Sequence, residues 1–118
     1  MRPRTGGGAG MAWSEVTGTS QAMLENNGYI ANNPSLVTLT LPVTAPLGSV
    51  VAVSGKGTGL WRMAQNSGQT VHFGTVNSTT GTAGYLQALN QYDCIELLAI
   101  TANTDFMVTS SVGNIDVE

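Results

Sequence analysis

Apolar and polar residues alternate along several short stretches of this chain. In one of them Val37, Leu39 and Leu41 alternate with threonines, and Pro42 follows. A period of two directs successive side chains to opposite faces of a β-strand, and proline cannot donate a hydrogen bond inside a sheet. Residues 37–41 are therefore predicted to form a half-buried strand that ends at Pro42.

Similar stretches recur along the chain and define its fold class. Turn-forming clusters rich in glycine, asparagine, serine and threonine separate them. Two short stretches, residues 20–27 and 84–93, have the composition or spacing of helices instead. The pattern predicts an all-β domain, an antiparallel β-sandwich or barrel-like fold. The further strand candidates are residues 49–55, 60–65, 69–74, 94–100 and 105–111.

Charged residues are scarce in this chain. They make up 9% of the 118 residues, against about 25% in an average protein, so hydroxyl and amide side chains must cover the surface. Such a surface suits packing against other copies or binding of neutral ligands. The net charge is −3, and beyond residue 10 the only basic residues are Lys56 and Arg62. An acidic body disfavours contact with a phosphate backbone, so no nucleic acid partner is expected.

The first ten residues differ in composition from the rest. They contain a proline and three consecutive glycines, so residues 1–10 are interpreted as a flexible linker or a cloning remnant, and residues 11–118 as a single β domain. No apolar run approaches the roughly 20 residues of a membrane span, and the N-terminus lacks the apolar segment of a signal peptide. No membrane insertion is expected.

Residues 55–59, GKGTG, raise the question of a nucleotide site. A phosphate-binding loop places four residues between its first glycine and a Gly-Lys-Ser/Thr, and the dinucleotide fingerprint is GxGxxG. Here a glycine follows Lys56, and the three glycines are spaced GxGxG. The stretch is predicted to be a hairpin turn whose glycines adopt positive φ, within a three-stranded antiparallel meander over residues 50–74.

No catalytic, metal-binding or cofactor-binding constellation is predicted. His72 alternates with Val71 and Phe73, which predicts a polar, outward or intersubunit histidine rather than a catalytic base. The carboxylates are scattered singly at turns and strand ends, where Asp93 would serve turn chemistry. The lone Cys94 cannot form an internal disulfide and is predicted to be a buried, inert thiol.

Three segments of the chain resemble a known family of domains. They are GYIANNPSLVTLTLP, LGSVVAVSGKGTGLWRMAQNSGQTVHFG and TTGTAGYLQALNQYDCIELLAITANTDFMVTSSVGNI. They are similar to the C-terminal domains of bacteriophage tail fibre and tail spike-like proteins and of related bacterial surface proteins. The resemblance implies a β-rich homotrimer, a location in the virion or outside the cell, and other fibre or virion subunits as partners. It transfers no catalytic residues.

The resemblance and the polar segments together suggest a function. Residues 24–35 and 73–85 are expected to be exposed loops that bind a neutral glycan of the host cell surface. The function expected is a non-enzymatic structural, trimerising and receptor-binding domain, and the alternative is a monomeric carbohydrate-binding module of a secreted bacterial protein. Trp13, Trp61 and Tyr92 are further aromatic candidates for stacking on sugars, and a core or interface position is favoured for Trp61. The candidate ligand-binding residues are Tyr29, Asn32, Asn33, Asn77, Thr79 and Tyr85.

Overall fold

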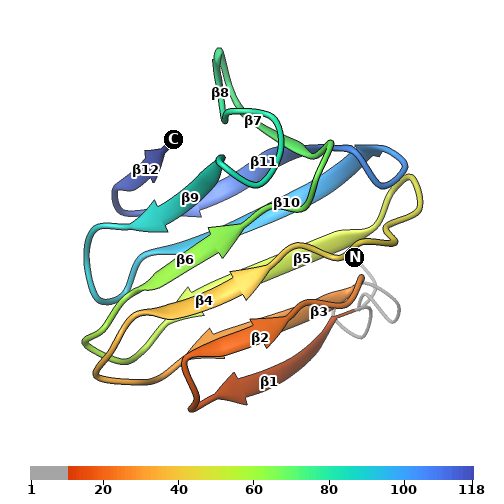
Figure 1. Cartoon of the computed structure of the whole chain (residues 1–118). Helices are drawn as coiled ribbons and strands as arrows, with labels where there is room; N and C mark the ends of the chain where they lie inside the picture. The colour runs from red at the N-terminus through yellow and green to blue at the C-terminus, as the bar shows by residue number, and fades with distance from the viewer. Residues whose placement is uncertain (1–10) are drawn as a thin grey trace, which may run out of the picture.

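The computed structural model describes residues 11–118 as two β-sheets packed face to face (Figure 1). The linker expected over residues 1–10 lies outside the described residues. Residues 11–118 contain no helix, and so none that is long and apolar enough to cross a membrane. The strands are β1 (Ala12–Val16), β2 (Ser20–Ala22), β3 (Asn27–Ala31), β4 (Val37–Thr40), β5 (Val50–Gly55), β6 (Trp61–Ala64), β7 (Thr70–Phe73), β8 (Val76–Asn77), β9 (Tyr85–Ala88), β10 (Cys94–Thr101), β11 (Asp105–Val112) and β12 (Ile115–Val117).

The chain alternates between the two sheets. One sheet has seven strands in the order β1-β3-β5-β10-β11-β7-β8, and the other has five in the order β12-β9-β6-β4-β2. The predicted all-β class is confirmed, and the two layers are compatible with a β-sandwich. The prediction of antiparallel sheets is wrong, because both sheets are mixed.

The first six strands form three stacked coils, which we call the coil half. Each coil contributes one strand to each sheet, so β1, β3 and β5 pair in parallel, as do β2, β4 and β6. Parallel neighbours need a crossover connection, and here the crossover is the strand in the opposite sheet. The chain therefore winds around its own core.

The corners of successive coils stack through backbone hydrogen bonds. The N–H groups of Lys56 and Gly57 both donate to the carbonyl of Ala31 (2.9 Å), and Gly59 N–H donates to the carbonyl of Asn33 (2.9 Å). A Cβ on Gly59 would overlap the carbonyl oxygen of Ser35. Glycine is needed in this corner because another backbone passes so close to it.

This corner corrects two predictions for the GKGTG stretch. The three-stranded meander is wrong, because β5 and β6 belong to different sheets and β6 runs parallel to β4. The glycines of residues 55–59 do not have positive φ; Leu60, the next residue, does (69°). Gly57 and Gly59 are required here by close packing against residues 32–35, and not by a tight hairpin turn.

The last six strands introduce antiparallel pairs into both sheets, and we call them the return half. β9 pairs antiparallel with β6, and β10 pairs antiparallel with β5 and with β11. β12 closes the five-stranded sheet against β9, while β7 joins β11 in parallel. The hairpin of β7 and β8 projects at the top of Figure 1.

The core lies between the sheets and follows the predicted alternation. Val37, Leu39, Trp61 and Met63 are fully buried on the inner face of the five-stranded sheet. The core position expected for Trp61 is confirmed, and its indole N–H donates to the carbonyl of Asp93 (2.9 Å). Burying such side chains supplies the main driving force for folding.

Neither candidate helical stretch is helical. Residues 20–27 contain β2 and the start of β3, and residues 84–93 contain β9. In β9, Leu86 and Ala88 are buried while Tyr85 and Gln87 face outward. Packing at period two against the opposite sheet outweighs the helix propensity of these residues.

Candidate functional site

The six predicted ligand-binding residues do not form one site. Tyr29 was expected to be exposed, which is wrong: its side chain is only 4% exposed, and its hydroxyl accepts a hydrogen bond from Leu24 N–H (2.8 Å). The predicted loop 24–35 contains strand β3, and Tyr29 lies on the inner face of that strand. The glycine and asparagines on either side of Tyr29 suggested a loop. The segment is a strand instead, and Tyr29 and Ala31 are both buried because they lie on its inner face.

Asn32 and Asn33 hold the corners of the coil half together. The side-chain amide of Asn32 donates to Glu15 Oε2 (2.7 Å), and that of Asn33 donates to the carbonyl of Thr17 (2.6 Å). Lys56 Nζ contacts the same Glu15 oxygen at 3.1 Å. The hydrogen bond from Asn32, and then the ion pair with Lys56, lower the pKa of Glu15. These amides fasten neighbouring coils to each other.

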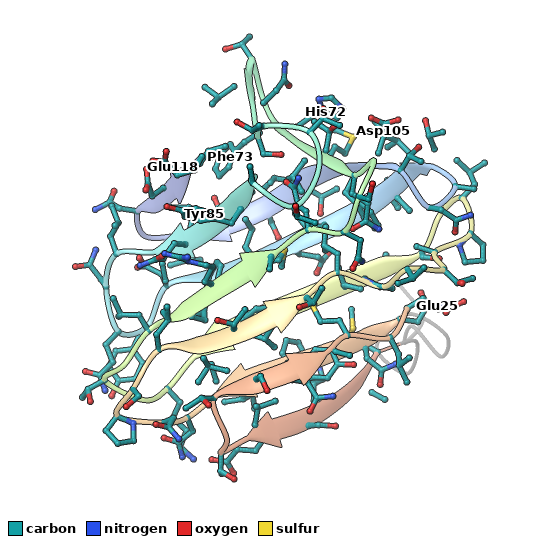
Figure 2. All side chains as sticks on the ribbon, viewed as in Figure 1. Glu25, His72, Phe73, Tyr85, Asp105 and Glu118 are labelled. Atoms are coloured by element: carbon teal, nitrogen blue, oxygen red, sulfur yellow. The ribbon has the colours of Figure 1, made fainter. Side chains whose placement is uncertain are left out.

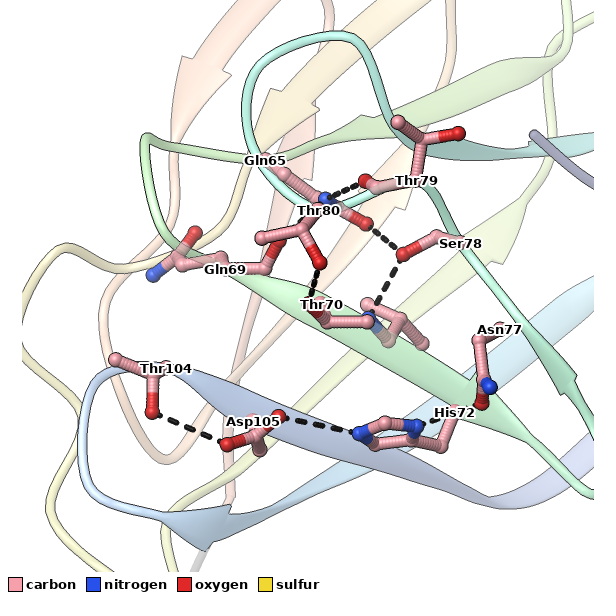
Figure 3. A network of polar contacts seen from close by, with 11 residues as sticks. Gln65, Gln69, Thr70, His72, Asn77, Ser78, Thr79, Thr80, Thr104 and Asp105 are labelled. Carbon is pink, nitrogen blue, oxygen red and sulfur yellow. Dashed lines mark hydrogen bonds and ion pairs between the residues drawn. The ribbon is translucent and has the colours of Figure 1, made fainter.

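Asn77 and Thr79 belong to a segment that buried amides fasten to the core (Figure 3). Gln65 is buried, and its Nε2 lies within 2.9 Å of the carbonyl oxygens of Thr79 and Gly81. The Ser78 hydroxyl donates to Gln65 Oε1. Buried polar groups of this kind are costly to leave unpaired, so the pairing defines one loop conformation. Residues 78–81 are therefore an anchored loop.

His72 bridges β8 and β11 through both of its ring nitrogens. Nδ1 lies 2.7 Å from Asn77 Oδ1, and Nε2 lies 3.1 Å from Asp105 Oδ1. The hydrogen bond to Asn77, followed by that to Asp105, raises the pKa of His72, and the histidine lowers the pKa of Asp105. The outward orientation predicted for His72 is confirmed. Because an oxygen atom from each neighbouring strand is hydrogen-bonded to one ring nitrogen, His72 joins β8 to β11, and we call this arrangement the histidine clip.

Tyr85 lies on the outer face of the five-stranded sheet, on β9 (Figure 2). The Arg62 guanidinium carbon is 3.9 Å from the centroid of the Tyr85 ring, and Arg62 Nε donates to Gln87 Oε1 (2.8 Å). A cation over one ring face occupies the surface that a sugar would stack on. Tyr85 is half-buried rather than an open platform.

Trp13 is the exposed aromatic that lies beside a groove. Its side chain is 50% exposed on the outer face of the seven-stranded sheet, next to Gly28 of β3. Three ring atoms, Cδ2, Cε3 and Cε2, lie 2.5, 2.6 and 2.7 Å from where a Cβ on Gly28 would be. Such similar distances mean that the indole lies flat on the glycine. The groove beside Trp13 is lined by Ala52, Ser54, Cys94, Glu96, Ser110 and Val112, among others.

This groove was not predicted from the sequence, and the signal for it is Gly28, a glycine inside strand β3. A strand-interior glycine marks a place where another group approaches the backbone closely. The prediction that Cys94 is buried is wrong. Its side chain is half-buried and faces the groove, because Ile95 and Leu97 take the inward positions of β10. Asp93, by contrast, accepts hydrogen bonds from turn N–H groups as predicted.

The same sheet face also carries an apolar patch, formed by Val50, Leu98, Ile100 and Met107. Val50, Leu98 and Met107 are neighbours across β5, β10 and β11. Ile100 and Met107 are each 39% exposed, and the other two side chains are half-buried. We call this set the outer-face patch. Exposed apolar clusters on a sheet mark contact surfaces more often than isolated apolar side chains do.

Metal chemistry and sequence comparison add no further site. Within residues 11–118 no three His, Cys, Asp or Glu side chains are grouped so that they could hold a metal ion. A scan against models of protein families finds no match to this chain, and a search of curated protein sequences finds no similar sequence. Functional inference therefore depends on the geometry of the two features on the seven-stranded sheet.

Proposed function

We propose that this chain is a non-enzymatic structural domain of a phage tail fibre or spike-like protein, which assembles as a homotrimer and binds a receptor on the host surface. Its partners are then other copies of itself, neighbouring fibre or virion subunits and a surface glycan. Its location is the virion or the extracellular space. The observation that carries the assembly is the outer-face patch, and the tail fibre origin is proposed from the resemblance of the three sequence segments.

The patch lies on strands that need cover on both sides. β5 and β10 are central in the seven-stranded sheet, and their inner faces pack against the five-stranded sheet. Their outer faces present Val50 and Leu98, which are half-buried, and Ile100, which is exposed. Strands with apolar residues on both faces are typical of sheets buried between two layers. A second copy of the chain supplies the missing layer.

Low charge favours the approach of identical copies. Only 9% of the residues are charged, so like charges seldom face each other across an interface between copies. The coil half also suits an elongated particle, because stacked coils contact only their neighbours and present repeated surfaces. Both features support self-association through the seven-stranded sheet.

The test is the mass of the protein in solution, measured by light scattering on the parent and two variants. We expect the parent at three times 12.2 kDa, with a melting temperature that rises with protein concentration. Met107→Glu places a charge in the patch and is expected to give monomers. Thr38→Glu, on the outer face of the five-stranded sheet, is the matched control and should remain trimeric.

A parent that is monomeric and whose melting is independent of concentration down to low micromolar protein would contradict the assembly. If Met107→Glu remains trimeric and Thr38→Glu becomes monomeric, the interface lies on the five-stranded sheet instead.

The second candidate function is a monomeric carbohydrate-binding module, and the flat, exposed indole of Trp13 is the observation that favours it.

A further inference from the structure

We infer that the groove beside Trp13 is a binding site for a neutral glycan. The inference deepens the receptor-binding part of the proposed function and depends on it, but it does not require the trimer. It moves recognition away from Tyr29 and Tyr85 to the outer face of the seven-stranded sheet.

The indole of Trp13 has the geometry of a stacking platform. One ring face rests on Gly28, and the side chain remains 50% exposed, so the opposite ring face is open to solvent. Gly28 is itself buried beneath the ring. Any larger residue at position 28 would lift the indole off the sheet. An aromatic ring held flat on a rigid strand loses little conformational entropy when a ligand stacks on it.

Small side chains form the floor of the groove, and two strands flank it. Ala52 and Ser54 on β5 and Cys94 on β10 provide a low floor between Trp13 on one side and β11 on the other. Ser110 of β11 pairs with Glu96 of β10, so its hydroxyl projects from the same face. The groove thus places an apolar platform beside hydroxyl groups, and this combination matches a sugar ring, which has apolar C–H faces and a polar rim.

Glu96 provides the strongest acceptor in the groove. Thr109 Oγ1 lies 3.2 Å from the Glu96 carbonyl and 3.4 Å from Glu96 Oε2, at a point where β10 and β11 shift register. Register shifts re-aim side chains and are frequent beside binding sites. A carboxylate can accept hydrogen bonds from two sugar hydroxyls at once.

The negative charge of the groove favours a neutral glycan over an anionic one. Its lining residues include one carboxylate, Glu96, and no basic side chain. A sialylated or sulfated glycan would bring its negative charge next to Glu96 without a compensating cation. Neutral sugars carry no such penalty.

The groove and the outer-face patch occupy different rows of the sheet. Trp13, Gly28, Ala52 and Glu96 are aligned across β1, β3, β5 and β10. The patch lies two residues further along, in the row that contains Val50 and Leu98. One end of the sheet face can therefore pack against another copy while the other end stays open to ligand.

The test is isothermal titration of the full chain with cellohexaose, mannohexaose and dextran as neutral probes, and with polysialic acid as the anionic probe. We expect binding of at least one neutral probe and none of the anionic one. Trp13→Ala should weaken that binding by about tenfold or more, as for loss of a desolvated aromatic contact. Glu96→Gln should weaken it less, since the amide keeps one acceptor.

Tyr92→Ala is the matched control, because Tyr92 is 70% exposed in the turn before β10 and does not line the groove. It should bind like the parent. Lack of binding of every neutral probe by the parent at millimolar concentration would overturn the inference, as would equal affinity of the parent and Trp13→Ala. Light scattering on the same samples separates the two proposals: a monomer that binds the glycan contradicts only the assembly. Conversion of trimer to monomer by Trp13→Ala would place the indole under a partner copy and overturn the site.

Discussion

The coil half and the return half are held together in different ways. In the coil half, the backbones of successive corners approach closely and hydrogen-bond to each other directly, as from Gly59 to Asn33, and the side chains of Asn32 and Asn33 add to these bonds. In the return half, buried side-chain amides provide the fastening, as Gln65 does for residues 78–81. The first arrangement depends on close backbone approach, and the second depends on a few buried amides. Single substitutions should therefore disturb the two halves through different mechanisms.

The largest effect is expected at Gln65. Gln65→Met keeps the length of the buried side chain but removes its donors, so the carbonyls of Thr79 and Gly81 lose a partner. Leaving these part-buried acceptors and the buried Gln69 carbonyl without their donor should lower the free energy of unfolding by about 3 kcal/mol. Urea unfolding measures this, with Gln21→Met as the control, because Gln21 is exposed and its side-chain amide donates to the carbonyl of the adjacent residue. Equal stability of the two variants would mean that the return half does not depend on its amides.

An effect of about 2 kcal/mol is expected for Gly59→Ala, because the new methyl group overlaps the Ser35 carbonyl and forces the stacked corners apart. Gly18→Ala is the matched control in the coil half, because nothing lies within 4 Å of a Cβ at Gly18. Thermal melting of both variants measures the difference. If Gly59→Ala and Gly18→Ala have the same melting temperature, close stacking of the corners does not stabilise the coils.

Much of the strand content could be predicted from the sequence, whereas the pairing of strands could not. Alternation in residues 37–41 correctly indicated β4 and its buried face, because that signal is local. The coils have unequal lengths: Ala12 pairs with Asn27 and Asn27 with Val51, spacings of 15 and 24 residues. No fixed period therefore appears in the sequence, and the parallel coils were missed.

The candidate site was harder to predict than the strands, since it depends on which strands become neighbours. The open position of Trp13 follows from Gly28, which precedes Tyr29 in what looked like a loop. Trp13 itself was one of several aromatic candidates in the sequence, and only the pairing of β1 with β3 shows that its ring lies flat and exposed. Similarly, the role of Asn32 in joining coils depends on the position of Glu15 in the adjacent strand.

The smallest expected effect is a pH response confined to the return half. His72 has a raised pKa, so its contribution is complete below about pH 6.5 and is lost as the pH rises through its folded-state pKa. Asp105 has a lowered pKa, so its contribution is lost only as the pH falls through that lower value. Since both side chains are partly exposed to solvent, which screens their interaction, the change should stay below about 1 kcal/mol.

Hydrogen exchange at pH 5.5 and 8.5, corrected for the intrinsic exchange rate, measures this response. Protection of the β7 and β11 amides should decrease at the higher pH in the parent and stay constant in His72→Gln. Amides of β1 and β3 provide the internal control, because Glu15 has a lowered pKa and stays ionised throughout this interval. An equal loss of protection in both halves would show that titration of His72 does not cause the pH response.

The order of the strands also determines how the molecule should respond to mechanical load. β1 and β2 lie at one edge of their sheets, and β8 and β12 lie at the opposite edges. A tensile force applied between Ala12 and Val117 reaches the first coil before any other, and that coil pairs only with the second. We expect extension to proceed by unwinding one coil at a time, and the steps should differ in length because the coils do. The domain would then act as a spring with discrete steps rather than as a link that breaks all at once.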